Sequence, residues 1–249
     1  MNTLRSVLIT GAAGGIGTAL CDAYSAEGWR VLATDHHGSI MPRSADAFIP
    51  ADLEEIATDD DVRTAFRNDV SAASGDASLT ALINNAASQI LGNVSVITLA
   101  DWERTLRVNV TAPFRLAQVF LDDLRIADGT IINIGSVHAQ ATKQEFVAYA
   151  MSKAAIHGMT RAMAVDLGGN PRVICVAPAA VSTPMLEEGF KENPQALDML
   201  SAAHPIGRIA TPVEIAQAIV AMSQHPFHFA TGTTIWLDGG ILSRLHDPI

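Results

Sequence analysis

The sequence is poor in cysteine and in aromatic residues, and it contains no long apolar run. Cys21 and Cys175 are its only cysteines, and each falls in an apolar segment that predicts a helix or a strand. We therefore expect no disulfide. No stretch reaches the roughly 20 apolar residues of a membrane span, and no apolar leader follows Met1. These absences predict a cytoplasmic protein with no membrane contact.

Basic residues are also scarce, because 16 Lys and Arg stand against 26 Asp and Glu and give a formal net charge of −10. The few basic positions are scattered along the chain, so we expect no nucleic-acid partner. The adjacent pair His36 and His37, and the pair His225 and His228, fall in predicted surface connections. Because such loop histidines are more often solvated than bound to a metal, we expect no metal site.

Seven β-branched or apolar segments alternate with helical patterns, near residues 5–10, 30–35, 47–51, 79–84, 129–135, 172–177 and 233–237. This alternation is typical of a doubly wound α/β fold, in which about seven parallel strands carry helices on both faces. The chain has 249 residues, of which 49% are hydrophobic, and no repeat or linker, so it can bury one large core. We expect a single domain over residues 1–249.

A glycine-rich turn connects the first predicted strand to a helix expected at 16–28. Residues 10–17 read Thr-Gly-Ala-Ala-Gly-Gly-Ile-Gly. Glycines let the backbone turn sharply and approach a pyrophosphate, whose charge then meets free N–H groups at the helix N-terminus. Eighteen residues after Gly17, Asp35 can accept hydrogen bonds from an adenosine ribose and would repel a 2′-phosphate. The pattern predicts NAD as cofactor rather than NADP.

Tyr149 and Lys153 lie four residues apart, so a helix would present both on one face. On its own this spacing is common on solvated helix faces. A lysine beside a tyrosine favours the phenolate, lowers the tyrosine pKa from about 10 and suits proton transfer to a carbonyl oxygen. Ser136 follows the predicted strand at 129–135, so its hydroxyl is expected at the end of that strand.

Six residues fall at the carboxyl ends of predicted strands, where open parallel sheets bind their ligands. They are Gly11, Asp35, Asp52, Asn85, Ser136 and Pro178. Their common position predicts one ligand site along that edge of the sheet.

Together these motifs resemble the short-chain dehydrogenase/reductase family, with Thr-Gly-x-x-x-Gly-x-Gly at 10–17 and Tyr-x-x-x-Lys at 149–153. The resemblance spans nearly the whole chain: residues 84–87 are similar to the family's Asn-Asn-Ala-Gly, 178–179 to its Pro-Gly turn and 237–240 to its C-terminal strand ending. Ala87 and Ala179 replace family glycines, and alanine disfavours positive φ. The resemblance implies a Rossmann-type fold and hydride transfer with a nicotinamide cofactor.

The resemblance also implies a role for each motif residue. The catalytic residues would be Asn109, Ser136, Tyr149 and Lys153. The cofactor-binding residues would be Gly11, Gly14, Gly15, Ile16, Gly17, Asp35, Asp52, Leu53, Asn85, Ala86, Tyr149, Lys153, Pro178, Val181 and Thr183. Asp52 would hold the adenine ring, and Thr183, or else Ser182, would contact the nicotinamide carboxamide. Asn109 would support a distortion and a proton-relay water in a helix that is expected to begin near Asp101.

Gln89, His138 and Ala179 are the expected substrate contacts. Gln89 and His138 resemble carboxylate-binding residues of the family's 3-hydroxybutyrate dehydrogenases, but Phe146 stands where those enzymes carry a lysine, which removes a strong anion anchor. Residues 183–208 depart from the regular alternation and resemble the family's substrate-binding lid. Plain covering of the core is the alternative for this amphipathic segment.

These inferences predict an NAD-dependent oxidoreductase that interconverts a secondary alcohol and a ketone, with that small molecule as its partner. A 3-oxoacyl thioester or 3-hydroxy acid dehydrogenase is a narrower alternative, and a non-catalytic nucleotide-binding scaffold is an alternative of another class. An extended-family epimerase or dehydratase would need a differently spaced glycine motif and a longer substrate domain. The resemblance also implies a homotetramer formed through helices at 101–126 and 148–168, whose small residues equally suit packing within the chain.

Overall fold

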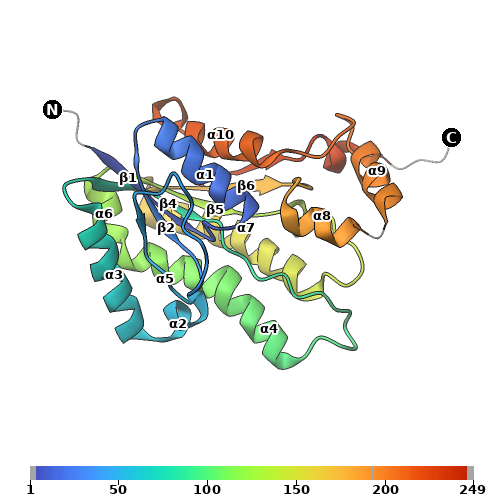
Figure 1. Ribbon diagram of the computed structural model, residues 1–249, viewed down its shortest axis with the longest axis horizontal. Coiled ribbons are helices and arrows are strands. Elements are labelled where there is room, and N and C mark those ends of the chain that lie inside the picture. Colours follow the sequence, from blue (N-terminus) through green and yellow to red (C-terminus); the bar gives the residue numbers. More distant parts are fainter. Residues whose placement is uncertain (1–3, 192, 246–249) are drawn as a thin grey trace.

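A sheet of parallel strands forms the centre of the molecule (Figure 1). The computed structural model describes residues 4–191 and 193–245, and in this part of the chain seven strands lie in the order β3-β2-β1-β4-β5-β6-β7. The strands are β1 (Arg5–Thr10), β2 (Arg30–Thr34), β3 (Ala47–Phe48), β4 (Ser78–Asn84), β5 (Thr130–Ile134), β6 (Arg172–Pro178) and β7 (Thr234–Leu237). The predicted Rossmann-type α/β fold is confirmed.

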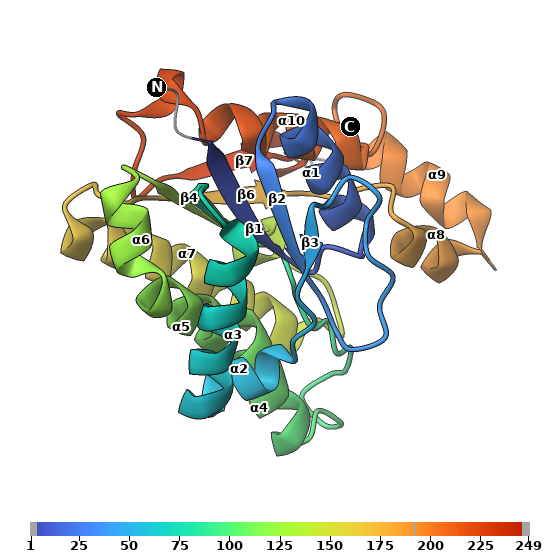
Figure 2. The same cartoon turned by 60° about the vertical axis from the view of Figure 1, so that its left-hand side comes forward.

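Helices cover both faces of the sheet (Figure 2). One face carries α1 (Gly15–Ala26) and α10 (Pro212–Met222), and the other carries α2 (Leu53–Thr58), α3 (Asp60–Ser74), α5 (Ala112–Val119), α6 (Leu121–Ile126) and α7 (Val147–Leu167). The remaining helices are α4 (Leu99–Leu106), which leads into a π-helical turn (Arg107–Thr111), and α8 (Pro184–Phe190) and α9 (Pro194–Ala203), which follow β6. Short 3₁₀ turns occupy Val137–Ala139, His225–Phe227 and Ile241–Ser243.

The central strands are buried on both faces. In β1, Val7 and Ile9 pack on the α1 and α10 side, while Leu8 packs on the opposite side, and all three are fully buried. Successive strand residues point to opposite faces, so a strand covered on both faces needs an unbroken apolar run. That run is the pattern from which the strand was predicted.

The third strand is shorter than the predicted segment 47–51. Pro50 has no N–H group and cannot donate to the neighbouring strand. The pairing direction nevertheless continues past it, because the N–H groups of Ile49 and Ala51 donate to the carbonyl oxygens of Ala33 and Asp35, both at 2.9 Å. The prediction was therefore right about the path of the backbone and wrong about the length of the regular strand.

The helix predicted to begin near Asp101 begins at Leu99 instead. Thr98 is its N-cap: the Thr98 hydroxyl accepts from the Asp101 N–H, and the Asp101 carboxylate accepts from the Thr98 N–H. This reciprocal pair satisfies two N–H groups that the first turn leaves free. Eight residues later, the regular helix gives way to the π-helical turn at Arg107–Thr111.

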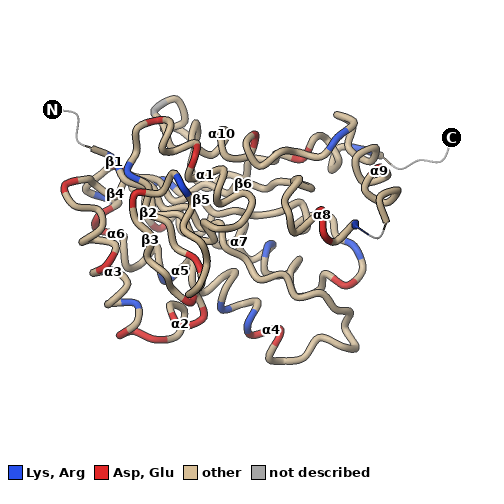
Figure 3. The backbone as a smooth tube through the Cα atoms, viewed as in Figure 1, with Lys and Arg blue, Asp and Glu red and all other residues tan. Residues whose placement is uncertain are grey.

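Along the backbone of the described residues, basic and acidic positions are spread over many elements rather than along one basic stripe (Figure 3). In the same part of the chain, no helix is both long enough and apolar enough to cross a membrane. Exposed apolar side chains of Phe114 on α5 and of Val147 and Val165 on α7 lie on helices that the predicted homotetramer would use. That assembly stays a prediction, as do the single domain and the lid at 183–208.

A line of hydrogen bonds crosses the core from β4 to α7. Asn84 Nδ2 donates to Asn133 Oδ1 at 2.8 Å, and Asn133 Nδ2 donates to Thr160 Oγ1 at 3.0 Å. All three side chains are buried. Buried polar groups cost free energy when they lack a partner, so this line fixes the position of α7 on the sheet.

Asn133→Ala should lower the free energy of unfolding by about 2–4 kcal/mol, because it breaks two buried hydrogen bonds and leaves groups of Asn84 and Thr160 unpaired. Urea denaturation followed by circular dichroism measures the change. His37→Ala, a substitution of an exposed loop residue, is the control. A loss below about 0.5 kcal/mol for Asn133→Ala would show that the line does not hold α7.

Candidate active site

The turn between β1 and α1 is too tight for a side chain at two positions. Gly11 has φ +65°, and a Cβ there would lie 2.8 Å from the Cα of Ala86. A Cβ on Gly17 would overlap the carbonyl oxygen of Gly11. Both positions therefore require glycine. The loops that follow β1 and β4 thus touch, backbone to backbone, at the edge where the site was predicted.

The side chain of Thr10 holds these two loops together. Its hydroxyl oxygen accepts from the N–H groups of Asn85 and Ala86, both at 3.0 Å, and the hydroxyl donates to the carbonyl oxygen of Ile83 at 3.3 Å. In return, Asn85 Nδ2 donates to the carbonyl oxygens of Thr10 at 2.9 Å and Gly11 at 3.0 Å. The structure therefore brings Asn85 and Ala86 to the glycine turn and uses the Asn85 amide to fix it.

Asp35 lies beside the glycine turn and is half-buried. Its Oδ2 accepts from the Ala13 N–H at 2.9 Å, and its Oδ1 accepts from the His36 N–H at 2.8 Å and from the Ser39 hydroxyl at 3.3 Å. A carboxylate offers about four acceptor positions. Asp35 therefore keeps capacity for a further donor, such as a ribose hydroxyl.

A cavity of about 220 Å³ opens between these loops, and we call it the strand-end cavity. Four of the predicted residues line it: Gly11, Asp35, Leu53 and Ala86. Seven residues that no motif assigned to the site complete the lining: Thr34, His36, Ala51, Ala87, Ser88, Arg104 and Val108. The first five are each next to a predicted site residue in the sequence, and this proximity is the only feature of the sequence that could have pointed to them. Arg104 and Val108 lie on a helical segment, and no motif gives the direction in which they point.

Asp52 and its neighbour Leu53 were both predicted to bind the cofactor, but the structure places them differently. Asp52 Oδ1 accepts from the Glu54 N–H at 2.8 Å, so the side chain caps α2. Asp52 does not belong to the lining of the strand-end cavity, whereas Leu53 does. The contact between Asp52 and an adenine ring stays a prediction.

The first turn of α1 suits the pyrophosphate of a dinucleotide. Helix α1 begins at Gly15 with Gly14 as its N-cap, and no side chain hydrogen-bonds the first turn, which includes Ile16. The N–H groups of such an uncapped first turn attract an anion. The residues present therefore fit NAD(P), and the contact of Gly14, Gly15 and Ile16 with its phosphates stays a prediction.

The segment after β6 returns over the glycine turn. Pro178 is the last residue of β6, and Val181 forms an isolated parallel bridge with Ala210. Thr183 caps α8 and packs so closely on the turn that a Cβ on Gly15 would lie 2.9 Å from Thr183 Cγ2. The structure therefore places the start of the predicted lid directly against the glycine turn.

Ser136, Tyr149 and Lys153 come together near the carboxyl end of β5. Ser136 lies two residues after β5, and the other two lie in the first two turns of α7. Ser136 lies close enough to Tyr149 for its hydroxyl to lower the Tyr149 pKa. Lys153 Nζ lies 5.5 Å from the centroid of the Tyr149 ring. Three residues that were predicted from separate motifs thus form one cluster.

Burial has the largest effect on the proton of Tyr149. Burial raises the pKa of Tyr149 to about 12, and the Ser136 hydroxyl offsets only part of this rise. The ammonium of Lys153 donates to the carbonyl oxygen of Ile134 at 2.7 Å, and burial lowers the pKa of Lys153 to about 8. Burial therefore sets the direction of the Tyr149 shift, and the lowering of its pKa by Lys153 stays a prediction.

Asn109 lies within the π-helical turn, so the predicted helix distortion is present. Its Oδ1 accepts from the Ser88 N–H at 2.7 Å, and its Nδ2 donates to the Ser88 carbonyl and to the Ser152 hydroxyl oxygen, both at 2.9 Å. Ser152 in turn donates to the carbonyl oxygen of Tyr149 at 2.7 Å. Asn109 thus ties the loop after β4 to α7, while its part in a proton relay stays a prediction.

A stack of rings borders Tyr149. The rings of His138 and Phe146 are parallel with centroids 4.5 Å apart, and the Tyr149 ring meets both edge-on, at 5.8 Å and 5.9 Å. His138 Nδ1 lies 2.9 Å from the Thr142 hydroxyl oxygen. Burial, and secondly the charge of Lys143, lowers the pKa of His138 to about 4. His138 is therefore neutral at pH 7 and offers a hydrogen bond without a charge.

The two alanines in place of glycine fit their backbone. Among the described residues other than glycine, positive φ occurs at Asp128 and Glu145, and neither Ala87 nor Ala179 is affected. Ala179 is half-buried and its N–H donates to the β7 backbone, whereas Gln89 is exposed on the loop after β4. The departures from the glycine pattern therefore impose no strain, and the roles of Ala179 and Gln89 stay predictions.

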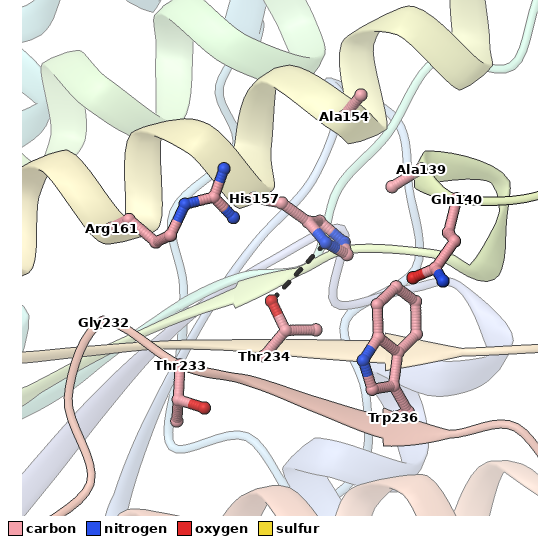
Figure 4. A pocket seen from close by; sticks show the side chains of 9 residues that line it. All are labelled: Ala139, Gln140, Ala154, His157, Arg161, Gly232, Thr233, Thr234 and Trp236. Carbon is pink, nitrogen blue, oxygen red and sulfur yellow. Dashed lines mark hydrogen bonds between the residues drawn. The ribbon is translucent and has the colours of Figure 1, made fainter.

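A second cavity, of about 700 Å³, lies between α7 and the outer strand β7 (Figure 4). It is lined by Ala139, Gln140, Ala154, His157, Arg161, Gly232, Thr233, Thr234 and Trp236. None of these is a predicted site residue.

His157 and the free, buried Cys175 pack so closely on Gly135, next to Ser136, that a Cβ on Gly135 would overlap both side chains. Cys21 is also free and buried, and within the described residues no three His, Cys, Asp or Glu side chains gather as metal ligands.

Comparisons with known proteins match nearly the full chain. A family model described as enoyl-(acyl carrier protein) reductase matches residues 11–242. 2-(S)-hydroxypropyl-CoM dehydrogenase 3 from Xanthobacter autotrophicus is 35% identical over 245 residues, which cover 94% of this chain and 95% of that protein.

Two solved structures share the fold over almost their whole length. An oxidoreductase of the short-chain dehydrogenase/reductase family from Burkholderia thailandensis has a TM-score of 0.82 at 29% identity, covering 98% of this chain and 94% of that one. A protein assigned as an NAD(P)-dependent gluconate 5-dehydrogenase from Beutenbergia cavernae, with NADP bound, has a TM-score of 0.85 at 27% identity and covers 98% of both chains.

The lowered pKa of Lys153 predicts a pH-dependent stability. The lysine pKa is 10.5 without the fold and about 8 within it, so between these values the unfolded chain binds more protons and the free energy of unfolding rises with pH. Lys153→Met, which cannot ionise, should lack this rise of up to about 3 kcal/mol. Urea denaturation of both proteins from pH 7 to 10.5 measures the difference. Parallel pH profiles would show that Lys153 keeps its ordinary pKa.

Proposed function

The chain belongs to the short-chain dehydrogenase/reductase family, whose members are oxidoreductases that act on CH–OH groups with NAD(P), and we propose that it interconverts a secondary alcohol and a ketone with NAD(H). The observation that carries this proposal is the cluster of Ser136, Tyr149 and Lys153 beside the strand edge that holds Asp35 and the glycine turn. The cluster supplies acid–base groups, and the edge supplies a place for the cofactor.

Tyr149 is the proposed acid–base residue. In ketone reduction its hydroxyl gives a proton to the substrate oxygen, and in alcohol oxidation it takes that proton back. Ser136, whose hydroxyl neighbours Tyr149, would orient the same oxygen and stabilise the negative charge that develops on it. Because burial raises the pKa of Tyr149, the phenol holds its proton at neutral pH, as reduction requires. When bound, the nicotinamide cofactor supplies or accepts the hydride.

Lys153 has donors to spare for this chemistry. One of its three N–H groups goes to the Ile134 carbonyl oxygen, and two remain for the ribose next to the nicotinamide and for a proton path toward solvent. Asn109 would complete that path through a water molecule. Its bonds to Ser88 and Ser152 give it a rigid position from which to do so.

Residues 183–208 would act as a lid that closes over the nicotinamide and excludes water. The contact between Thr183 and Gly15 supports this role, because it places the beginning of the segment over the cofactor path. Met185 on α8 and Met199 on α9 are exposed, as expected for side chains that cover an apolar substrate when the lid closes.

Secondary alcohols without an anionic group next to the reacting carbon are the proposed substrates. The neutral ring of His138 and the exposed amide of Gln89 can hydrogen-bond a substrate but cannot neutralise a carboxylate. Phe146, where a lysine would anchor such a group, is buried in the ring stack. The apolar residue at position 146 favours the general alcohol dehydrogenase, whereas Lys143, whose ammonium lies 4.7 Å from the centroid of the Phe146 ring, is the cation that a 3-hydroxy acid would use.

Tyr149→Phe should lower kcat at least about 100-fold, because it removes the transferable proton and keeps most of the ring's packing. NADH binding, measured by protein-to-nicotinamide energy transfer, should stay within a factor of about two. Lys153→Ala should damage both turnover and NADH affinity. Near-normal turnover of Tyr149→Phe with a panel of ketones would reject the mechanism, and a wild-type protein that binds NADH but oxidises it with no ketone would favour the scaffold.

The proposed preference for NAD(H) rests on Asp35, whose charge would repel a 2′-phosphate at the strand-end cavity. The ratio of kcat/KM for NADH to that for NADPH at pH 7.5 should exceed about 10, a difference of about 1.4 kcal/mol. Asp35→Asn should lower the ratio by removing the charge without changing the shape of the side chain. Equal values for the wild type, or a preference for NADPH, would overturn the assignment.

A further inference from the structure

The strand-end cavity combines flat apolar walls with one charge of each sign. Leu53 and Val108 are the larger apolar residues of its lining, Asp35 supplies a carboxylate, and Arg104 is the only arginine or lysine among the described residues that line it. If Asp35 binds the ribose, as proposed above, the base attached to that ribose must lie among Leu53, Val108 and Arg104. No motif of the sequence pointed to Arg104.

Arg104 is held by one edge of its guanidinium. Its Nε lies 2.8 Å from Glu54 Oε1, and the other carboxylate oxygen of Glu54 is 3.2 Å from Nε and Nη2 of Arg107. Glu54 directly follows Leu53, so the residue that holds Arg104 is anchored to the cavity wall. Within residues 4–191 and 193–245, no group bonds the terminal Nη1 and Nη2 atoms of Arg104. The Arg104 side chain is 55% exposed, which leaves it accessible to a ligand.

The local charges argue for stacking rather than for binding of a phosphate. Arg107 also pairs with Glu103 at 3.4 Å, so two arginines and two glutamates form a group with no net charge. Asp35, on the same cavity, adds a negative charge. A phosphate would find little attraction here, whereas a guanidinium binds the face of an aromatic ring through its planar, weakly hydrated surface. Exposed ion pairs add little to stability, so folding alone does not require this arrangement.

We propose that Arg104 is a binding residue for the adenine ring of the cofactor, with its guanidinium oriented by Glu54 and lying over the ring on the solvent side of the strand-end cavity. The proposal rests on the proposed function, because the adenosine half of NAD(H) must enter this cavity. Arg104 lines the strand-end cavity, whereas Ser136, Tyr149 and Lys153 do not, so Arg104 would affect affinity and not the chemical step.

Titration calorimetry of the cofactor-free full-length protein with adenosine 5′-monophosphate tests the proposal without turnover. Arg104→Met keeps the apolar stem and should weaken binding roughly five- to thirty-fold, the range expected from a partly desolvated cation–π contact. Arg104→Lys should lose most of the same affinity because an ammonium has no flat face. Nicotinamide mononucleotide, which has no adenine, should bind all variants alike.

Arg107→Met is the matched control, because Arg107 pairs with the same Glu54 but does not line the cavity. Its affinity for adenosine 5′-monophosphate should change less than about twofold. Unchanged binding by Arg104→Met, or an equal loss in Arg107→Met, would overturn the proposal. Selective loss of adenosine 2′-monophosphate binding in Arg104→Met would overturn it in favour of phosphate recognition. A wild-type protein that binds neither nucleotide but binds NADH would also overturn it, while one that binds none of them would refute the proposed function itself.

Discussion

The hydroxyl group of Thr10 joins the loops that follow β1 and β4, and the arrangement of the site depends on that junction. It accepts two backbone N–H groups from the β4 loop, and the Asn85 amide returns two bonds to the β1 side. With the loops fixed, Gly11 and Ala86 meet without room for a further atom, and Asp35 reaches the backbone of the same turn. The cofactor path is therefore built from backbone held by side chains, which explains why so few of its residues are charged.

Exclusion of water sets the protonation of the catalytic cluster. Burial raises the pKa of Tyr149 and lowers those of Lys153, His138 and His157, so each shift favours the neutral form. A cluster of this kind resists the creation of charge in the resting protein. The charge that develops on a substrate oxygen would then meet oriented donors in a site of low dielectric, where each hydrogen bond is stronger than in water.

The sequence predicted what depends on local rules and missed what depends on orientation. Buried parallel strands need unbroken apolar runs and the turn at 10–17 needs glycine, so both were visible in the sequence, as was the position of Tyr149 and Lys153 on one helix face. The hydrogen-bond partner of the Lys153 ammonium was not visible in the sequence. The Ile134 carbonyl oxygen and the substrate site both lie within the reach of this side chain, and in the structure the ammonium donates to Ile134. Arg104 was missed because neither its helical direction nor its partner Glu54 follows from any motif.

The number of residues in the π-helical turn at Arg107–Thr111 sets the rotation of α4 relative to α5. Each residue of an α-helix advances the chain by about 100°, so one residue more or less in this turn rotates all of α4 against the packed helix that follows. Arg104 faces the strand-end cavity and Asn109 faces Ser152 only with the present number of residues in this turn. Their joint geometry is thus encoded in the number of residues between them and α5, and a one-residue deletion there could undo it while every side chain that binds or reacts remained in the sequence.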